Sequence, residues 1–216
     1  MLYLCSGLRS RLPLWVSVVR DLFLVYVSVL VFSLISREEA LELVKKYLKN
    51  DKMVKHVLAV EAIMRALARE LGEDEEVWGL TGLLHDLDYE LVGKELSKHG
   101  LITPEIIKGK VPDEVIDAIK AHNELTGYVS ESRLAYALKA ADQVSGLIIA
   151  TALVMPNKKL AEVKVKSLKK KFKQKDFARN VKRDKIRYCE KLGLTLERFF
   201  EISLKALQEI HDVLGL

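Results

Sequence analysis

Apolar residues recur three and four positions apart almost everywhere after Ser36, and no stretch sustains the strict alternation that marks a half-buried strand. This spacing places apolar side chains on one face of a helix. Ser36 and Glu39 also form the pattern of a capping box, so we expect the first helix of the globular part to begin there. The pattern therefore predicts an all-α fold, a compact bundle of about ten helices.

Helix start and stop signals agree with the periodicity. Gly72 is a stop signal, Pro112 suits a first turn, and Thr195 can cap the last helix. The chain has no GxGxxG, GxxxxGK[ST] or GxSxG motif and no internal repeat, which argues against dinucleotide binding, P-loop chemistry and the hydrolase elbow. The helices are expected at residues 37–49, 52–71, 74–87, 89–98, 104–109, 112–123, 131–154, 157–173, 176–192 and 195–214.

The first 35 residues differ from the rest of the chain. Residues 22–35 are 14 residues without a charge, which is short of the roughly 20 that a spanning helix needs, and no cleavage site of a secretory signal follows them. Three interpretations stay open: an extension from a misplaced start codon, a hydrophobic helix over residues 12–35 on a membrane or partner, and a packed part of the core. We treat residues 1–35 as an extension and residues 36–216 as one globular domain.

Cysteine content indicates the cellular compartment, and the charge distribution indicates possible binding partners. The two cysteines, Cys5 and Cys189, form no CxxC pair, which favours a reducing, cytoplasmic compartment. Between Lys158 and Arg187 there are 14 Lys or Arg against three acidic residues, a local +11, which leaves −6 for the remainder of a chain whose net charge is +5. These basic C-terminal helices, from about residue 157, could form a solvated face, a phosphate funnel or a nucleic-acid contact surface.

Histidines and aspartates fall in apolar helical segments. His56 lies in KHVLAVEAIM, His85 and Asp86 end GLTGLLHDLDYE, and Asp142 lies in LAYALKAADQVSG. Burying such groups without partners costs several kcal/mol. One divalent cation would satisfy two imidazoles and two carboxylates together, whereas the alternative is a separate hydrogen-bond partner for each. The sequence therefore predicts a metal site made of these four side chains.

The order His, then His-Asp at a helix end, then a distant Asp resembles the HD superfamily of metal-dependent phosphohydrolases, over roughly residues 52–147. Residues 165–216 resemble the tail of a small HDIG-type subgroup of hydrolases. The resemblance implies an HD-domain bundle in which a metal-activated water attacks phosphorus. Members with two metals add two histidines before the last aspartate, here His99 and His122, which would make Asp86 the bridging carboxylate. Ligands without thiolate favour Mn, Fe, Co, Ni or Mg.

Other charged residues near these ligands are weaker candidates. Besides Asp86, a carboxylate next to activated water could shuttle protons, which suggests Asp88 and Glu90 as catalytic residues. Basic side chains could bind the substrate phosphate, and the candidates are Lys139, Arg179, Lys182 and Arg183. The ordinary alternative for each is a solvated surface charge. His211, beside Asp212 near the C-terminus, is expected to be an ordinary helix-end cation.

These residues predict an enzyme that hydrolyses a phosphoester in a nucleotide or related small phosphorylated metabolite. The alternative is a nucleic-acid or nucleotide binding module with a vestigial HD site and a basic contact surface. A third possibility is the same hydrolase held at a membrane by residues 12–35. The sequence names no substrate, because the same ligands can serve pockets of different shape.

Overall fold

The computed structural model describes residues 34–216, which form helices with no strand among them. The expected all-α class is therefore confirmed. The α-helices are α2 (Arg37–Tyr47), α3 (Asp51–Leu71), α4 (Glu75–Leu84), α5 (Tyr89–Val92), α6 (Thr103–Ile107), α7 (Asp113–His122), α8 (Arg133–Leu153), α9 (Val165–Lys173), α10 (Arg183–Ile186), α11 (Leu196–Glu209) and α12 (His211–Leu214). The 3-10 helices are η1 (Leu96–Lys98), η2 (Glu124–Thr126), η3 (Leu160–Glu162) and η4 (Arg187–Leu192).

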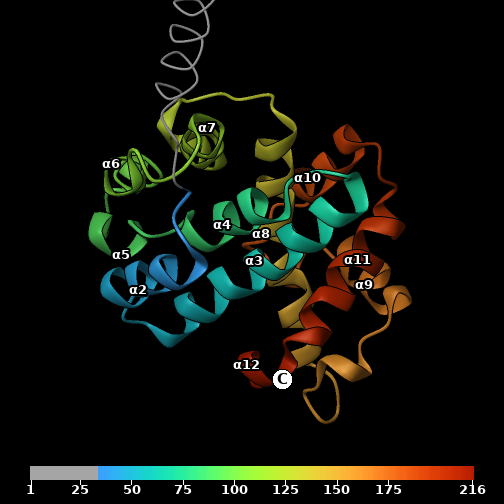
Figure 1. Cartoon of the computed structure of the whole chain (residues 1–216). Coiled ribbons are helices and arrows are strands. Elements are labelled where there is room, and N and C mark those ends of the chain that lie inside the picture. The colour runs from blue at the N-terminus through green and yellow to red at the C-terminus, as the bar shows by residue number, and fades with distance from the viewer. Residues whose placement is uncertain (1–33) are drawn as a thin grey trace, which may run out of the picture. The chain divides into compact units, whose positions relative to one another are not determined.

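Two helices of 21 residues each, α3 and α8, form the centre of the bundle (Figure 1). Helix α3 packs against α4, α8 and α11, while α7, α9, α10 and η4 pack against α8. Ile63 and Leu67 of α3 and Leu138 and Leu147 of α8 are completely buried. Burying a side chain of this size contributes roughly 1.5–3 kcal/mol, so the two central helices hold the outer ones through apolar contact.

The helix termini are capped where the sequence indicated. Ser36 Oγ accepts a hydrogen bond from the Glu39 amide, and the Glu39 carboxylate accepts one from the Ser36 amide. Gly72 ends α3 in the left-handed conformation, with φ +70°. Thr195 Oγ1 accepts from the Arg198 amide at the start of α11. Each such contact satisfies a backbone group that the helix leaves unpaired at its end.

Helices α3 and α4 approach closely at Gly82. A Cβ atom at this position would lie 2.9 Å from the backbone of Val60 and of Glu61. Only glycine fits without displacing one of the two helices. Gly82 lies one turn before His85, and Val60 one turn after His56. The close contact therefore brings the two histidines together.

Four of the expected helices are interrupted or begin later. Gly93 has φ +54° and ψ −110°, which separates α5 from η1. The last helix breaks at Ile210, between α11 and α12. The affected expectations are residues 89–98, 157–173, 176–192 and 195–214. Periodicity alone could not show these breaks, because a turn with buried apolar residues keeps a similar spacing.

The loop before α10 is organised by Arg183, whose guanidinium donates hydrogen bonds to four backbone carbonyls of the loop. Ala178, one of the four, has a positive φ of +46°, a conformation that non-glycine residues rarely adopt. The interrupted helix expected over residues 176–192 is thus a closed loop followed by a short helix. The carbonyls belong to Gln174, Phe177, Ala178 and Val181.

The interpretations of the N-terminal segment concern residues 1–35, of which residues 1–33 lie outside the described residues. Of the two described residues before Ser36, Ile35 is buried and its amide donates to the Lys110 carbonyl. Among the helices of residues 34–216, none combines the length and apolar character needed to cross a membrane. The division into an extension and a globular domain stays a prediction.

Candidate metal centre

Asp86, in the turn after α4, lies at the meeting point of four histidines. Its Oδ1 is 3.1 Å from His85 Nε2, 3.2 Å from His99 Nε2 and 3.4 Å from His122 Nε2. Its Oδ2 is 3.5 Å from His56 Nε2. One carboxylate therefore faces four imidazole nitrogens that come from four separate parts of the chain.

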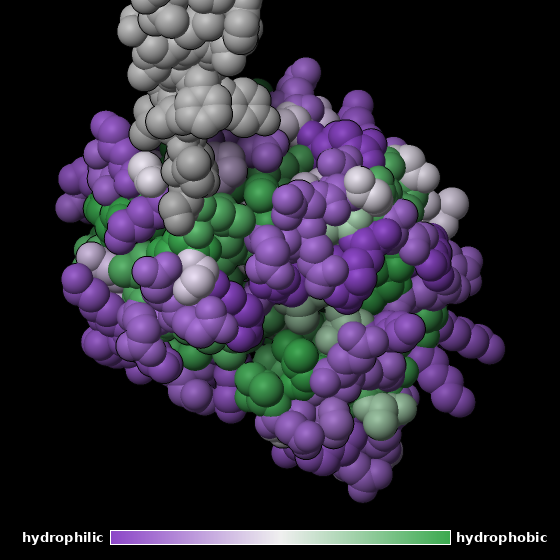
Figure 2. Space-filling view, viewed as in Figure 1, coloured by the Kyte–Doolittle hydropathy of each residue, from purple (hydrophilic) through white to green (hydrophobic). Residues whose placement is uncertain are grey.

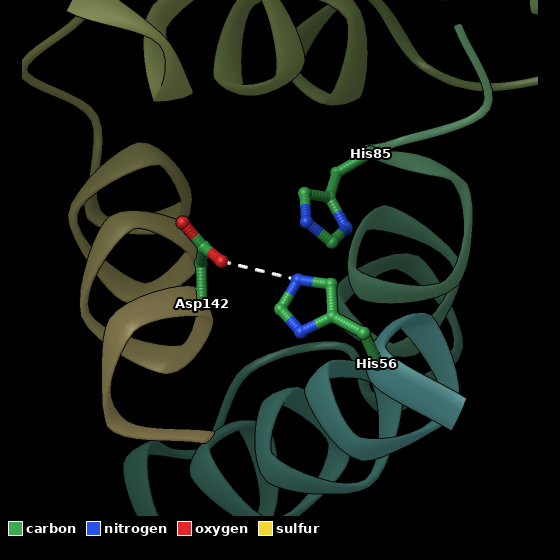
Figure 3. Close-up of side chains that lie close together, drawn as sticks. All are labelled: His56, His85 and Asp142. Atoms are coloured by element: carbon green, nitrogen blue, oxygen red, sulfur yellow. Dashed lines mark ion pairs between the residues drawn. The ribbon is translucent and has the colours of Figure 1, made fainter. Parts of the chain in front are cut away.

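Asp142 of α8 closes one side of this arrangement. Its Oδ1 lies 3.1 Å from His56 Nε2. Figure 3 shows Asp142, His56 of α3 and His85 at the end of α4 pointing into the same space. Two groups of residues could each hold a metal ion in the described part of the chain, with ligand atoms within 4.8 Å of one another. They are His56, His85 and Asp142, and His85, Asp86 and His122.

Backbone carbonyls fix the rings of His85 and His122. His85 Nδ1 lies 2.8 Å from the Gly82 carbonyl oxygen, and His122 Nδ1 lies 2.5 Å from that of Ile119. A carbonyl only accepts, so each Nδ1 must carry the hydrogen and each Nε2 presents a lone pair to the centre. This is the orientation that metal-ligating histidines have in proteins.

His99 and His56 are oriented by side chains. His99 Nδ1 is 2.8 Å from the Asp88 carboxylate, and His56 Nδ1 is 3.4 Å from Ser145 Oγ. The Ser145 hydroxyl donates to the Asp142 carbonyl, so its oxygen is free to accept from the imidazole. All four Nε2 atoms therefore point at the same centre.

Two nitrogen atoms or pairs of nitrogen atoms in this centre are not satisfied by the side chains around them. His85 Nε2 is completely buried and has no hydrogen-bond partner within residues 34–216. His99 Nε2 and His122 Nε2 are 3.0 Å apart. Two lone pairs at this distance repel each other unless a proton or a cation lies between them. These imidazoles and carboxylates thus fit a divalent cation.

The pKa values reflect the same crowding. Burial lowers the pKa of His85 to about 4. Burial also opposes a charge on His99, but hydrogen bonds to Asp86 and Asp88 outweigh it and raise its pKa to about 10. For Asp142 the hydrogen bond from His56 outweighs burial and lowers the pKa to about 2. Without metal, the protein therefore keeps ionised carboxylates beside a protonated His99.

A cavity of about 340 Å³ opens onto the ligands. Lys182 and Lys185 line one part of it, and Tyr89 and Met53 line another. Lys185 is 4% exposed, and its Nζ lies 3.2 Å from the His122 carbonyl oxygen. The cavity thus combines a candidate metal centre, two cations and an apolar wall.

The remaining candidates from the sequence lie elsewhere. The Asp88 carboxylate is buried and accepts hydrogen bonds from His99 and from the amides of the following loop. Glu90 accepts from the amides of Lys49 and Asn50 at the surface. Neither faces the cavity. Asp88 therefore positions His99, and Glu90 joins two chain segments.

The four basic candidates also separate. Lys182 lines the cavity, whereas Arg183 is used by the backbone carbonyls of its loop. Lys139 is buried, with Nζ 5.7 Å from the centre of the Tyr188 ring. Arg179 lines a different hollow. The sequence analysis missed Lys185 and Tyr89, because nothing in the local pattern distinguishes Lys185 from the other lysines of the basic stretch.

Comparison with known proteins finds relatives that match the region of this centre. Residues 53–147 match the family model of the HD domain. The chain is 33% identical over 102 residues to Ribonuclease Y of Lawsonia intracellularis (strain PHE/MN1-00). The matched residues are 45% of this chain and 19% of that protein. It is 36% identical over 101 residues to Ribonuclease Y of Acholeplasma laidlawii (strain PG-8A), covering 44% and 18%.

The chain thus spans about a fifth of the length of the curated relatives it matches. No solved structure matches it. The matched region contains all six residues of the centre, from His56 to Asp142, and the resemblance that the His, His-Asp and Asp order suggested is confirmed. Residues 53–147 are thus similar to the HD domain.

Proposed function

We propose that the chain is a metal-dependent phosphohydrolase that cleaves a phosphoester in a nucleotide or related phosphorylated compound. The observation that carries the proposal is the convergence of four Nε2 atoms on Asp86 beside a cavity lined by Lys182 and Lys185. The same ligands without lysines nearby would suit a structural metal ion as well as a catalytic one. Lysines in the same cavity favour an anionic substrate.

Six side chains would hold the metal. The ligands of a first ion would be His56, His85, Asp86 and Asp142. His99 and His122 would hold a second ion, with Asp86 shared between the two. When bound, divalent ions lower the pKa of water toward neutrality and offset charge on the transferring phosphoryl group. Oxygen and nitrogen ligands favour Mn, Fe, Co, Ni or Mg.

The residues around the ligands would bind and orient the substrate. Lys185 is buried, and its ammonium group is held by the His122 carbonyl, which fixes it at the edge of the cavity. Lys182 is exposed and pairs with Glu124 at 3.3 Å. A phosphate oxygen could replace that weak surface pairing. The two lysines would therefore hold the phosphate, with Lys185 as the fixed contact.

Tyr89 also lines the cavity. The residue is 41% exposed, and its ring packs edge-on against His99, with 5.3 Å between ring centres. An exposed aromatic ring beside a phosphate site suits a nucleobase or a ribose. The name of the matched relatives, Ribonuclease Y, supports a phosphodiester of RNA as one candidate substrate.

The test is hydrolysis by purified protein with added Mn or Co. Phosphate release from nucleotides and opening of cyclic nucleotides would be screened, together with bis(p-nitrophenyl) phosphate as a small diester. His85→Ala removes a completely buried ligand and should abolish metal-dependent activity. Glu90→Gln changes a carboxylate outside the cavity and should retain it. Unchanged turnover by folded His85→Ala protein would contradict the proposal.

The second candidate function is a nucleic-acid or nucleotide binding module with an inactive HD site. It is favoured by the +11 charge between Lys158 and Arg187. Binding of this kind would weaken steeply with salt and would not depend on metal. Metal-dependent turnover excludes it.

A further inference from the structure

A second hollow is lined by residues from the end of α9, the loop before α10, α10 and the start of η4. It has a volume of about 540 Å³, within the roughly 300–1,000 Å³ typical of ligand pockets. Its apolar lining comes from Val181 and from Phe172, which is buried and has Arg187 5.5 Å from its ring centre. The charged lining residues are Lys173, Lys175, Arg179, Arg183, Asp184 and Arg187. We name this hollow the basic basin.

Three cations of the basic basin are free to bind an anion, whereas Arg183 and Arg187 have partners of their own. Lys173, Lys175 and Arg179 are exposed, and none of them forms an ion pair or a side-chain hydrogen bond within residues 34–216. The hollow between α3 and α11 is different, because Arg198 there pairs with Glu70 at 2.7 Å and with Glu201 at 3.2 Å. Unpaired like charges around one hollow repel each other, which a bound polyanion would relieve.

The basin is also held in a fixed shape. The Arg183 guanidinium donates to four carbonyls of the loop that carries Lys175 and Arg179. Arg183 Nε is buried at the basin and has no hydrogen-bond partner among the described residues. The loop amide of Lys182 donates to Gln143, a residue of the metal cavity. The loop is therefore held by hydrogen bonds to Arg183 and to Gln143, which lines the metal cavity.

The two hollows adjoin along the chain. Lys182 lines the metal cavity, whereas its neighbours Val181 and Arg183 line the basic basin. One short chain segment therefore contributes to both hollows. The space-filling view shows one face of the described residues, which is mainly hydrophilic with apolar residues between the polar ones (Figure 2).

We infer that the basic basin binds a single nucleic-acid strand that extends from the metal cavity, so that the substrate is an oligonucleotide and not a mononucleotide. Phosphates of the flanking nucleotides would contact Lys173, Lys175 and Arg179. Backbone contacts of this kind carry no sequence information, so binding would tolerate any sequence. The inference relies on the proposed function only for what happens in the metal cavity.

Binding can be measured without turnover, by fluorescence anisotropy of a labelled 12-nucleotide single strand with the full chain. In Lys175→Glu/Arg179→Glu the affinity should fall at least tenfold. The slope of log affinity against log salt should decrease by about 0.7 for each phosphate that the variant no longer neutralises. The matched control is Lys164→Glu/Lys166→Glu, which makes the same change in net charge at exposed positions outside both hollows. Its affinity should change less than threefold.

Equal decreases in affinity in the two double variants would overturn the inference, because the effect would then come from net charge alone. Inorganic polyphosphate that competes as strongly as the strand would also overturn it, since a simple polyanion would suffice. With active protein, the ratio of kcat/KM for the 12-mer to that for a dinucleotide should exceed tenfold and fall in Lys175→Glu/Arg179→Glu. Strand binding without any hydrolysis would refute the proposed function and leave the basin supported.

Discussion

Asp88 and Glu90 are two residues apart in the sequence, yet their carboxylates have different partners. Asp88 is completely buried and accepts from His99 and from three loop amides, those of Gly100, Ile102 and Thr103. Glu90 is exposed and accepts from the amides that precede α3. A ligand imidazole depends on its outer partner for orientation and basicity. Of these two carboxylates, only that of Asp88 contacts a candidate ligand imidazole.

Asp88→Asn should therefore weaken metal binding by about 10- to 100-fold, the usual effect of removing an outer-shell partner. The amide NH₂ would also face backbone donors that now point at a carboxylate. Metal titration of the metal-free protein measures the effect. Glu90→Gln is the control and should bind metal as the unmodified chain does. Equal affinities in the two variants would show that Asp88 does not position His99.

A second prediction at this scale concerns His99 and pH. Its pKa is raised to about 10 in the metal-free protein, so the imidazole is protonated at about pH 7 to 9. Its stabilising charge is fully present below the unfolded pKa near 6.5 and is lost as pH rises through about 10. An ion bound by His99 must displace that proton.

Metal affinity should therefore rise with pH across this window, by up to about tenfold per pH unit. Calorimetric titration in buffers of different ionisation enthalpy would count the protons released on binding. His99→Gln should release fewer protons than the unmodified chain. Affinity that is flat between about pH 7 and 9 would be inconsistent with a protonated His99.

At the scale of elements, the contact between α3 and α4 decides where the histidines meet. The rings of His56 and His85 lie with centres 5.4 Å apart, although they belong to different helices. Gly82 permits this approach, because its missing Cβ would lie 2.9 Å from the backbone of α3. The candidate metal centre thus depends on a glycine that lets two helices approach and whose carbonyl oxygen also orients His85.

Gly82→Ala should destabilise the protein by about 1–3 kcal/mol, the cost of inserting a methyl group into a packed interface. Gly146→Ala is a matched control, because a Cβ there would lie 3.4 Å from a Val181 methyl group, an ordinary contact. In mid-helix this control should be neutral or stabilising by up to about 1 kcal/mol. Urea unfolding of both variants measures the difference. A neutral Gly82→Ala would mean that α3 and α4 can separate without cost.

For the whole molecule, metal should be linked to stability. The six candidate ligands come from α3, α7, α8, the end of α4 and the segment after η1. An ion bound by them holds these elements together and binds only the folded chain. Saturation at 100 times the dissociation constant contributes about 2.7 kcal/mol.

Removal of metal by a chelator should therefore lower the Tm by roughly 5–10 °C for a chain of this size. Calorimetry with and without added Mn would show it. His85→Ala, in contrast, should have nearly the same Tm in both conditions. A Tm of the unmodified chain that does not respond to metal would argue against the centre.

The sequence determined the class of fold and the membership of the centre. Periodicity after Ser36 predicted helices, and the confirmed caps at Ser36 and Thr195 rest on local hydrogen bonds that a few residues can specify. His56, His85, Asp86 and Asp142 could be predicted to gather because each lies in an apolar segment that would bury it unsatisfied. His99 and His122 were expected only from the resemblance to the HD superfamily. Their grouping in space was expected, while their role as ligands stays a proposal.

The tertiary structure decided which charges reach the cavity. Lys185 lines it, whereas Arg183 is held by its loop, although only two positions separate them. In the same way the Asp88 carboxylate accepts a hydrogen bond from His99, whereas the Glu90 carboxylate accepts from the amides of Lys49 and Asn50. Whether a charged side chain reaches the cavity depends on the distance between packed helices and on which polar groups lie within its reach in the folded chain. A local pattern contains neither quantity, because both arise only when segments distant in the chain come into contact.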